Sequence, residues 1–137
     1  MRPWSSLLSA AVLVVSAAAA VAEEPLVCNV DALTSAQRER HLRLGRMLRS
    51  ALVDKVELES GYVFVLDLGR LPLDSAGAPV CVVEVAEWVE LESRCCPFLS
   101  FGIEVEPKGK NVRLRLTGGK GVKPFLESEL GLLEKAD

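Results

Sequence analysis

Apolar residues recur every three or four positions in three segments of the chain, which is the spacing of one helix face. The first segment covers residues 35–53, where Thr34 and Gln37 also form the pattern of a capping box. The second covers residues 80–94; it begins with β-branched residues, but its later apolar positions follow helical spacing. The third covers residues 122–134. We therefore predict three helices.

Apolar and polar residues alternate in four further segments, which predicts four strands in two hairpins. Residues 56–59 and 62–68 form the first hairpin, with its turn at Gly61. Residues 100–106 and 112–117 form the second. The element order is helix, hairpin, helix, hairpin, helix. Because each hairpin has one apolar face to cover, we predict an α+β fold: an antiparallel four-stranded sheet with helices packed on one face.

The N-terminal residues 1–22 have the pattern of a secretory signal peptide. Arg2 precedes an apolar, alanine-rich run, and small residues close the segment at positions 20–22. We expect a mature single α+β domain at residues 23–137 that is exported, periplasmic or secreted; an uncleaved anchor is the alternative. Export permits disulfides. The four cysteines allow three pairings, between which spacing does not decide.

The charge composition limits the classes of binding partner that we expect. The 16 basic and 19 acidic residues give a net charge of −3, so no strong positive field favours nucleic acid or, once the signal is removed, a membrane surface. His41 is the only histidine, which excludes a multi-histidine metal site within one chain. We predict a surface or helix-flank position for His41. A role as a lone base or ligand, or as the partner of Cys95 or Cys96, stays open.

The most distinctive stretch is Arg94-Cys95-Cys96-Pro97-Phe98, where two adjacent thiols stand at the point where a proline stops the second helix. Thiolates prefer soft metal ions, although two sulfurs alone do not complete a tetrahedral site. Cys28, Cys81, Glu92 or a second chain would have to supply further ligands. Adjacent thiols can also take part in disulfide exchange. A helix C-terminus disfavours thiolates, which Arg94 offsets in part.

Two readings compete with a thiol site. Cys95 and Cys96 can pack inside the domain beside Phe98 and Trp88, since cysteine is often buried. Alternatively, Trp88 and Tyr62 can belong to the contact surface of an interaction module, whose partner is another protein or a second copy of the chain. Four glutamates between positions 84 and 92 fit an exposed helix face. We assign no catalytic residue and do not favour an enzyme.

Several segments together resemble a family of small bacterial proteins. The resemblance covers nearly all of residues 23–137, and its most specific part is the Arg-Cys-Cys-Pro-Phe motif. The other matching segments are Leu33-Thr34, Ser60-Gly61-Tyr62-Val63-Phe64, Ala86-Glu87-Trp88-Val89, and Leu116-Thr117-Gly118 before Gly121-Val122-Lys123-Pro124-Phe125-Leu126. The resemblance implies no activity. It implies that Cys28 and Cys81 are additions to a family whose main thiols are the adjacent pair, and hence a Cys28–Cys81 disulfide.

The favoured hypothesis is an exported domain that binds a soft metal ion or metalloid through Cys95 and Cys96, with Glu92, Arg94 and Trp88 in supporting positions. A non-catalytic interaction or structural module with buried cysteines, and a thiol-redox protein, are the alternatives.

Overall fold

A computed structural model describes residues 26–109 and 111–129 of the chain. The predicted signal peptide and the end of the predicted last helix lie outside these residues. In chain order, the helices and strands are α1 (Ser35–Ala51), β1 (Leu52–Leu58), β2 (Gly61–Asp67), α2 (Val82–Cys95), β3 (Leu99–Val105), β4 (Asn111–Gly118) and α3 (Val122–Glu129). Short 3-10 turns lie at Val30–Ala32, Leu68–Arg70 and Pro107–Gly109. The α+β class and the antiparallel four-stranded sheet are confirmed.

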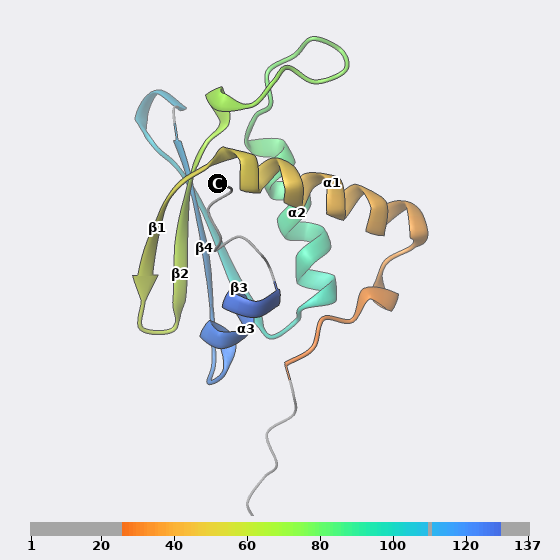
Figure 1. Cartoon of the computed structure of the whole chain (residues 1–137), viewed down its shortest axis with the longest axis vertical. Helices are drawn as coiled ribbons and strands as arrows, with labels where there is room; N and C mark the ends of the chain where they lie inside the picture. The colour runs from red at the N-terminus through yellow and green to blue at the C-terminus, as the bar shows by residue number, and fades with distance from the viewer. Residues whose placement is uncertain (1–25, 110, 130–137) are drawn as a thin grey trace, which may run out of the picture.

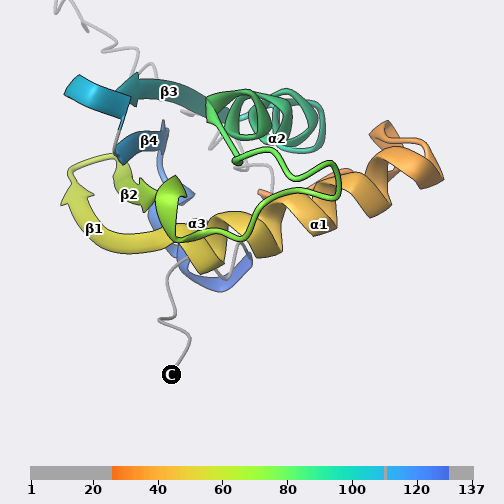
Figure 2. The same ribbon diagram turned by 90° about the horizontal axis from the view of Figure 1, so that it is seen from above.

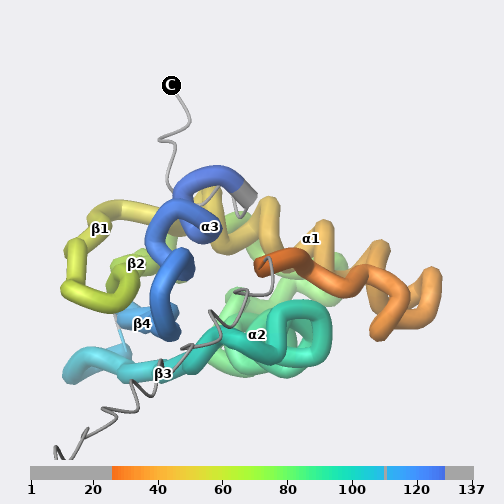
Figure 3. Tube along the Cα trace, turned by 90° about the horizontal axis from the view of Figure 1, so that it is seen from below, coloured from red at the N-terminus to blue at the C-terminus, as the bar shows by residue number. Residues whose placement is uncertain are grey.

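The sheet has the strand order β1-β2-β4-β3, so β2 and β4 join the two hairpins at the centre (Figure 1). The register places Phe64 opposite Leu114, and Leu114 opposite Ile103. Figures 2 and 3 show α1 and α2 on the same side of the sheet. Side chains that alternate along a strand point to opposite faces, so one set of apolar residues from β2 and β4 meets the helices.

The core lies between that sheet face and the helices. Its fully buried side chains include Leu44 and Leu48 from α1, Phe64 and Leu66 from β2, and Leu114 from β4. Burying one such side chain stabilises the fold by about 1.5–3 kcal/mol. The predicted capping box is confirmed: Gln37 N–H donates to Thr34 Oγ1, and Thr34 N–H donates to Gln37 Oε1.

Several predicted boundaries were wrong, and the largest difference is at strand β1, which begins at Leu52 and not at residue 56. Helix α1 ends at Ala51, because Leu52 adopts extended backbone angles and already pairs with Leu66 of β2. Helix α2 begins at Val82. Cys81 is its extended N-cap residue, and its N–H donates to the Glu84 carboxylate at 3.0 Å.

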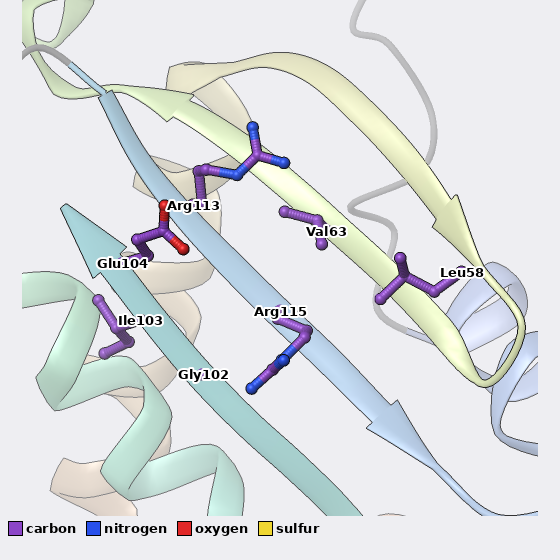
Figure 4. Close-up of a pocket in the computed structure, with 7 residues that line it drawn as sticks. All are labelled: Leu58, Val63, Gly102, Ile103, Glu104, Arg113 and Arg115. Carbon is purple, nitrogen blue, oxygen red and sulfur yellow. The ribbon is translucent and has the colours of Figure 1, made fainter. Parts of the chain in front are cut away.

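The face of the sheet away from α1 and α2 carries a shallow hollow of about 310 Å³ (Figure 4). Figure 4 shows Arg113 and Arg115 on β4, with Val63 on the neighbouring strand β2. A side chain at Gly102 would collide with the Arg115 guanidinium, which therefore lies across β3 at that point. None of the four cysteines lines this hollow.

Candidate thiol site

The C-terminal end of α2 carries a disulfide to the start of the described chain. Cys96 is bonded to Cys28, with 5.0 Å between their Cα atoms. Figure 1 shows the chain near residue 26 beside this end of α2. The predicted Cys28–Cys81 disulfide was wrong: Cys81 is a free, exposed thiol at the opposite end of the helix.

The helix stops where the sequence predicted. Pro97 disfavours helical backbone angles in the residue before it, and Cys96 takes the C-cap position with non-helical angles. The Cys96 N–H still donates to the Glu92 carbonyl at 2.8 Å. The Asn29 N–H donates to the Cys95 carbonyl at 2.8 Å, which satisfies one free carbonyl of the last turn. Residues on both sides of the disulfide are thus fixed by backbone hydrogen bonds.

The two adjacent cysteines do not share a role in this structure. Cys96 is fully buried and disulfide-bonded, whereas Cys95 is a free thiol that is 2% exposed within the hydrophobic core. Burial, and then the charge of Glu92, raises the pKa of the Cys95 thiol. The favoured hypothesis requires Cys95 and Cys96 to present two free thiols side by side to a metal ion. They do not do so in this structure.

Glu92 is the buried polar residue of the described chain, with none of its surface exposed. Its carboxylate meets two partners. Glu92 Oε2 lies 2.5 Å from His41 Nε2, and Glu92 Oε1 lies 3.9 Å from Cys28 Sγ. Burying a carboxylate is unfavourable unless hydrogen bonds or opposite charges compensate, and here His41 supplies the short contact. The expectation that Glu92 belongs to an exposed helix face was wrong.

His41 reaches Glu92 from α1. Its side chain is 21% exposed, and its ring stacks on Trp88 with 5.9 Å between centroids and 11° between planes. Trp88 in turn makes a T-shaped contact with Phe101 on β3. The predicted helix-flank position of His41 is confirmed, but its contact with Glu92 was not predicted. His41 connects the buried carboxylate with the surface of the molecule.

A pattern in the sequence could have revealed Glu92. The buried residues of α2 include Val85, Trp88, Glu92 and Cys95, which are spaced three, four and three residues apart. Glu92 therefore occupies a position on the apolar stripe of the helix, where a hydrophobic residue is expected. A carboxylate at such a position predicts a buried partner.

The other predicted supporting residues behave differently. Arg94 is exposed and pairs with Glu90 one turn earlier. It was expected to favour the thiolates at the helix end, but its ion pair is with Glu90 and not with a cysteine. Trp88 and Tyr62 are 2% and 3% exposed. Both complete the core, as the buried-cysteine reading predicted for Trp88, and they do not form an exposed aromatic surface.

Three potential ligand atoms come together at the corner: Cys28 Sγ, Cys96 Sγ and a carboxylate oxygen of Glu92 all lie within 4.8 Å of one another. We name these three residues with His41 the thiol corner. No helix among residues 26–109 and 111–129 has both the length and the apolar character needed to cross a membrane. The chain matches no protein-family model, no curated protein and no solved structure.

Proposed function

We propose that the protein is a thiol-redox protein whose Cys28–Cys96 disulfide is reduced and re-formed in the folded state. The observation that carries this proposal is the buried Glu92 carboxylate between the disulfide and His41. A disulfide that only braces a domain needs no buried acid beside it, and an apolar residue would fill that space without the cost of desolvation.

The two sulfurs differ in access. Cys96 is fully buried, whereas Cys28 is half-buried on the short segment before α1. An external thiolate therefore attacks Cys28 Sγ, forms a mixed disulfide there, and expels Cys96 Sγ. A second external thiol then releases Cys28 as a thiol. In total, two external thiols become one disulfide, and the protein gains two electrons and two protons.

The protons need a path, because Cys96 leaves as a thiolate inside the protein. Glu92 lies near both sulfurs, and His41 joins Glu92 to a partly exposed position. We assign to this pair the transfer of a proton between the buried sulfur and solvent. A positioned acid or base of this kind accelerates a reaction by about 10²–10⁴-fold.

Export of the chain, predicted from residues 1–22, places this chemistry in an oxidising compartment, where the disulfide is the resting form. The soft-metal hypothesis based on Cys95 and Cys96 loses support, since one sulfur is bonded and the other is packed in the core.

The competing function is a purely structural disulfide, which the burial of Cys96 favours. Native-state reduction of the full-length chain separates the two. Circular dichroism follows the fold during reduction, and samples are then quenched with acid and alkylated under denaturing conditions, so that mass spectrometry counts buried thiols as well as exposed ones. A redox disulfide gives four thiols in a folded protein. Two thiols until the protein unfolds would establish the structural disulfide instead.

Two variants extend this test. Glu92→Gln keeps the shape of the side chain and removes its acid function, and we expect it to slow reduction by about tenfold or more. Cys81→Ser, at the far end of α2, is the matched control and leaves the rate unchanged. Equal rates in wild type and Glu92→Gln would remove Glu92 from the mechanism.

A further inference from the structure

We propose that reduction turns the thiol corner into a binding site for one divalent metal ion of the zinc and cadmium class, held by Cys28, Cys96 and Glu92. The site differs from the adjacent-cysteine site expected from the sequence, because Cys95 is not among its ligands. It rests on the proposed function in one respect: the Cys28–Cys96 bond must be reducible in the folded protein.

The positions of the ligand atoms support the site. Glu92 lies in the last turn of α2, Cys96 is the C-cap residue four positions later, and Cys28 meets them from the N-terminal segment. Their three ligand atoms already lie within 4.8 Å of one another. Tetrahedral zinc with Zn–S bonds of about 2.3 Å places two sulfurs about 3.8 Å apart. Once the disulfide is broken, the sulfurs need only separate to that distance.

The donor set selects the class of ion. Two thiolates exclude magnesium and calcium, which take oxygen ligands. A carboxylate in the third position is a poor donor for Cu(I), which prefers sulfur, but it is an ordinary ligand of zinc. Two thiolates and a carboxylate carry three negative charges, which a divalent ion largely balances.

The surroundings hold one of the ligands in place. His41 Nε2 contacts the second oxygen of Glu92, so one carboxylate oxygen is fixed and the other faces Cys28. Metal sites commonly fix their ligands by such outer hydrogen bonds. His41 is thus a positioning residue of this site, and Trp88 holds the imidazole ring by stacking.

The chemical balance is simple. Reduction by an external thiol of the kind named above yields two cysteine thiols, and binding of one divalent ion then displaces two protons from them. Metal binding is therefore confined to the reduced protein. In the reverse exchange, an external disulfide takes up two electrons and two protons to become two thiols, the Cys28–Cys96 bond re-forms, and the ion is released.

The test uses the full-length chain after reduction with a phosphine, which offers no thiol of its own, and after four free thiols have been counted. Cadmium is added, and thiolate-to-cadmium charge-transfer absorbance is followed with equilibrium dialysis. We expect one cadmium per reduced chain and none per oxidised chain. Zinc should displace the bound cadmium or compete with it.

Variants locate the ligands. Cys28→Ser and Cys96→Ser should each weaken binding by at least about a hundredfold, and Glu92→Gln by about tenfold or more. Cys81→Ser and Cys95→Ser should retain stoichiometric binding. The reduced wild type is the matched reference for folding, since it also lacks the disulfide, and circular dichroism verifies each variant.

Two outcomes overturn the metal site. The first is a folded protein with four free thiols that binds no cadmium, a result that leaves the redox function intact. The second is retained binding in Cys28→Ser together with lost binding in Cys95→Ser, which assigns the metal to the adjacent pair. Failure to reach four thiols without unfolding is different, because it contradicts the redox function itself.

Discussion

The two halves of α2 present the same three kinds of residue in opposite surroundings. Cys81 is exposed at the N-cap of α2, and Glu87, near the middle of the helix, forms a bidentate pair with Arg40 of α1 at 2.6 and 2.8 Å. At the C-terminal end, Cys96 is buried in a disulfide, and Glu92 contacts His41, the next residue of α1. Each half of α2 thus has a cysteine at its end and a glutamate that pairs with a basic residue of α1.

The two pairs differ in how far their side chains are exposed to water. The side chains of Arg40 and Glu87 are each 39% exposed, whereas that of Glu92 is 1% exposed. An exposed ion pair between two helices loses little hydration and contributes little to the free energy of unfolding. A buried carboxylate has to be compensated by its neighbours, and its place beside a disulfide is the observation on which the proposed redox role rests.

The largest expected difference in stability is between loss of a disulfide cysteine and loss of Cys81. Cys28→Ser or Cys96→Ser removes a crosslink between residues 68 positions apart, which should lower the free energy of unfolding by about 4 kcal/mol. Cys81→Ser removes an exposed thiol and should change it by less than about 0.5 kcal/mol. Urea unfolding of the oxidised proteins measures both values. An equal loss in Cys81→Ser would break the comparison.

The two glutamates should differ next. Glu92→Ala leaves His41 without its partner and opens a space in the core, so we expect a loss of about 3 kcal/mol. Glu87→Ala breaks only the solvent-exposed pair and should cost at most about 1 kcal/mol. Thermal or urea unfolding compares them. Similar losses at both positions would show that Glu92 is not held as the structure describes.

Thiol reactivity sharpens the comparison without mutation. Cys81 is exposed, whereas Cys95 is buried beside Glu92 and the pKa of its thiol is raised. Alkylation requires an accessible thiolate, so iodoacetamide should modify Cys81 in the native oxidised protein and reach Cys95 only on unfolding. Peptide mapping by mass spectrometry identifies the modified residue. Modification of Cys95 at the rate of Cys81 would contradict its burial.

The smallest effect is the pH dependence of the exposed pair. The hydrogen bond from Arg40 lowers the pKa of Glu87 below its ordinary value of 4.5. A lowered carboxyl pKa stabilises the fold above the unfolded pKa, and this contribution disappears as the pH falls through the folded pKa. Arg40→Gln should therefore be less stable than wild type near neutral pH, and the gap should close in acid. A gap that persists in acid would exclude the ion pair as its cause.

Local sequence patterns predicted much of the fold. The capping box at Thr34, the hairpin alternation and the stop at Pro97 are local features, and each depends on residues close together in the chain. The end of α1 was missed because pairing between Leu52 and Leu66 competes with helix formation there, and that pairing is a long-range interaction.

The thiol corner was only half predictable. Adjacent cysteines before a proline marked the right place, but the pairing of Cys28 with Cys96 depends on how the N-terminal segment returns to the end of α2. The contact between His41 and Glu92 joins residues 51 positions apart. Glu92 alone left a local trace, its place on the apolar stripe of α2.

The most direct measurement is an equilibrium titration of the full-length protein in glutathione or dithiol redox buffers, with the oxidised fraction determined by alkylation. Reversible exchange in the folded state predicts a single two-electron transition with a midpoint above roughly −300 mV. It also predicts that oxidation and reduction trace the same curve. A disulfide that stays intact below that potential, or opens only as the protein unfolds, would contradict a redox role for Cys28 and Cys96.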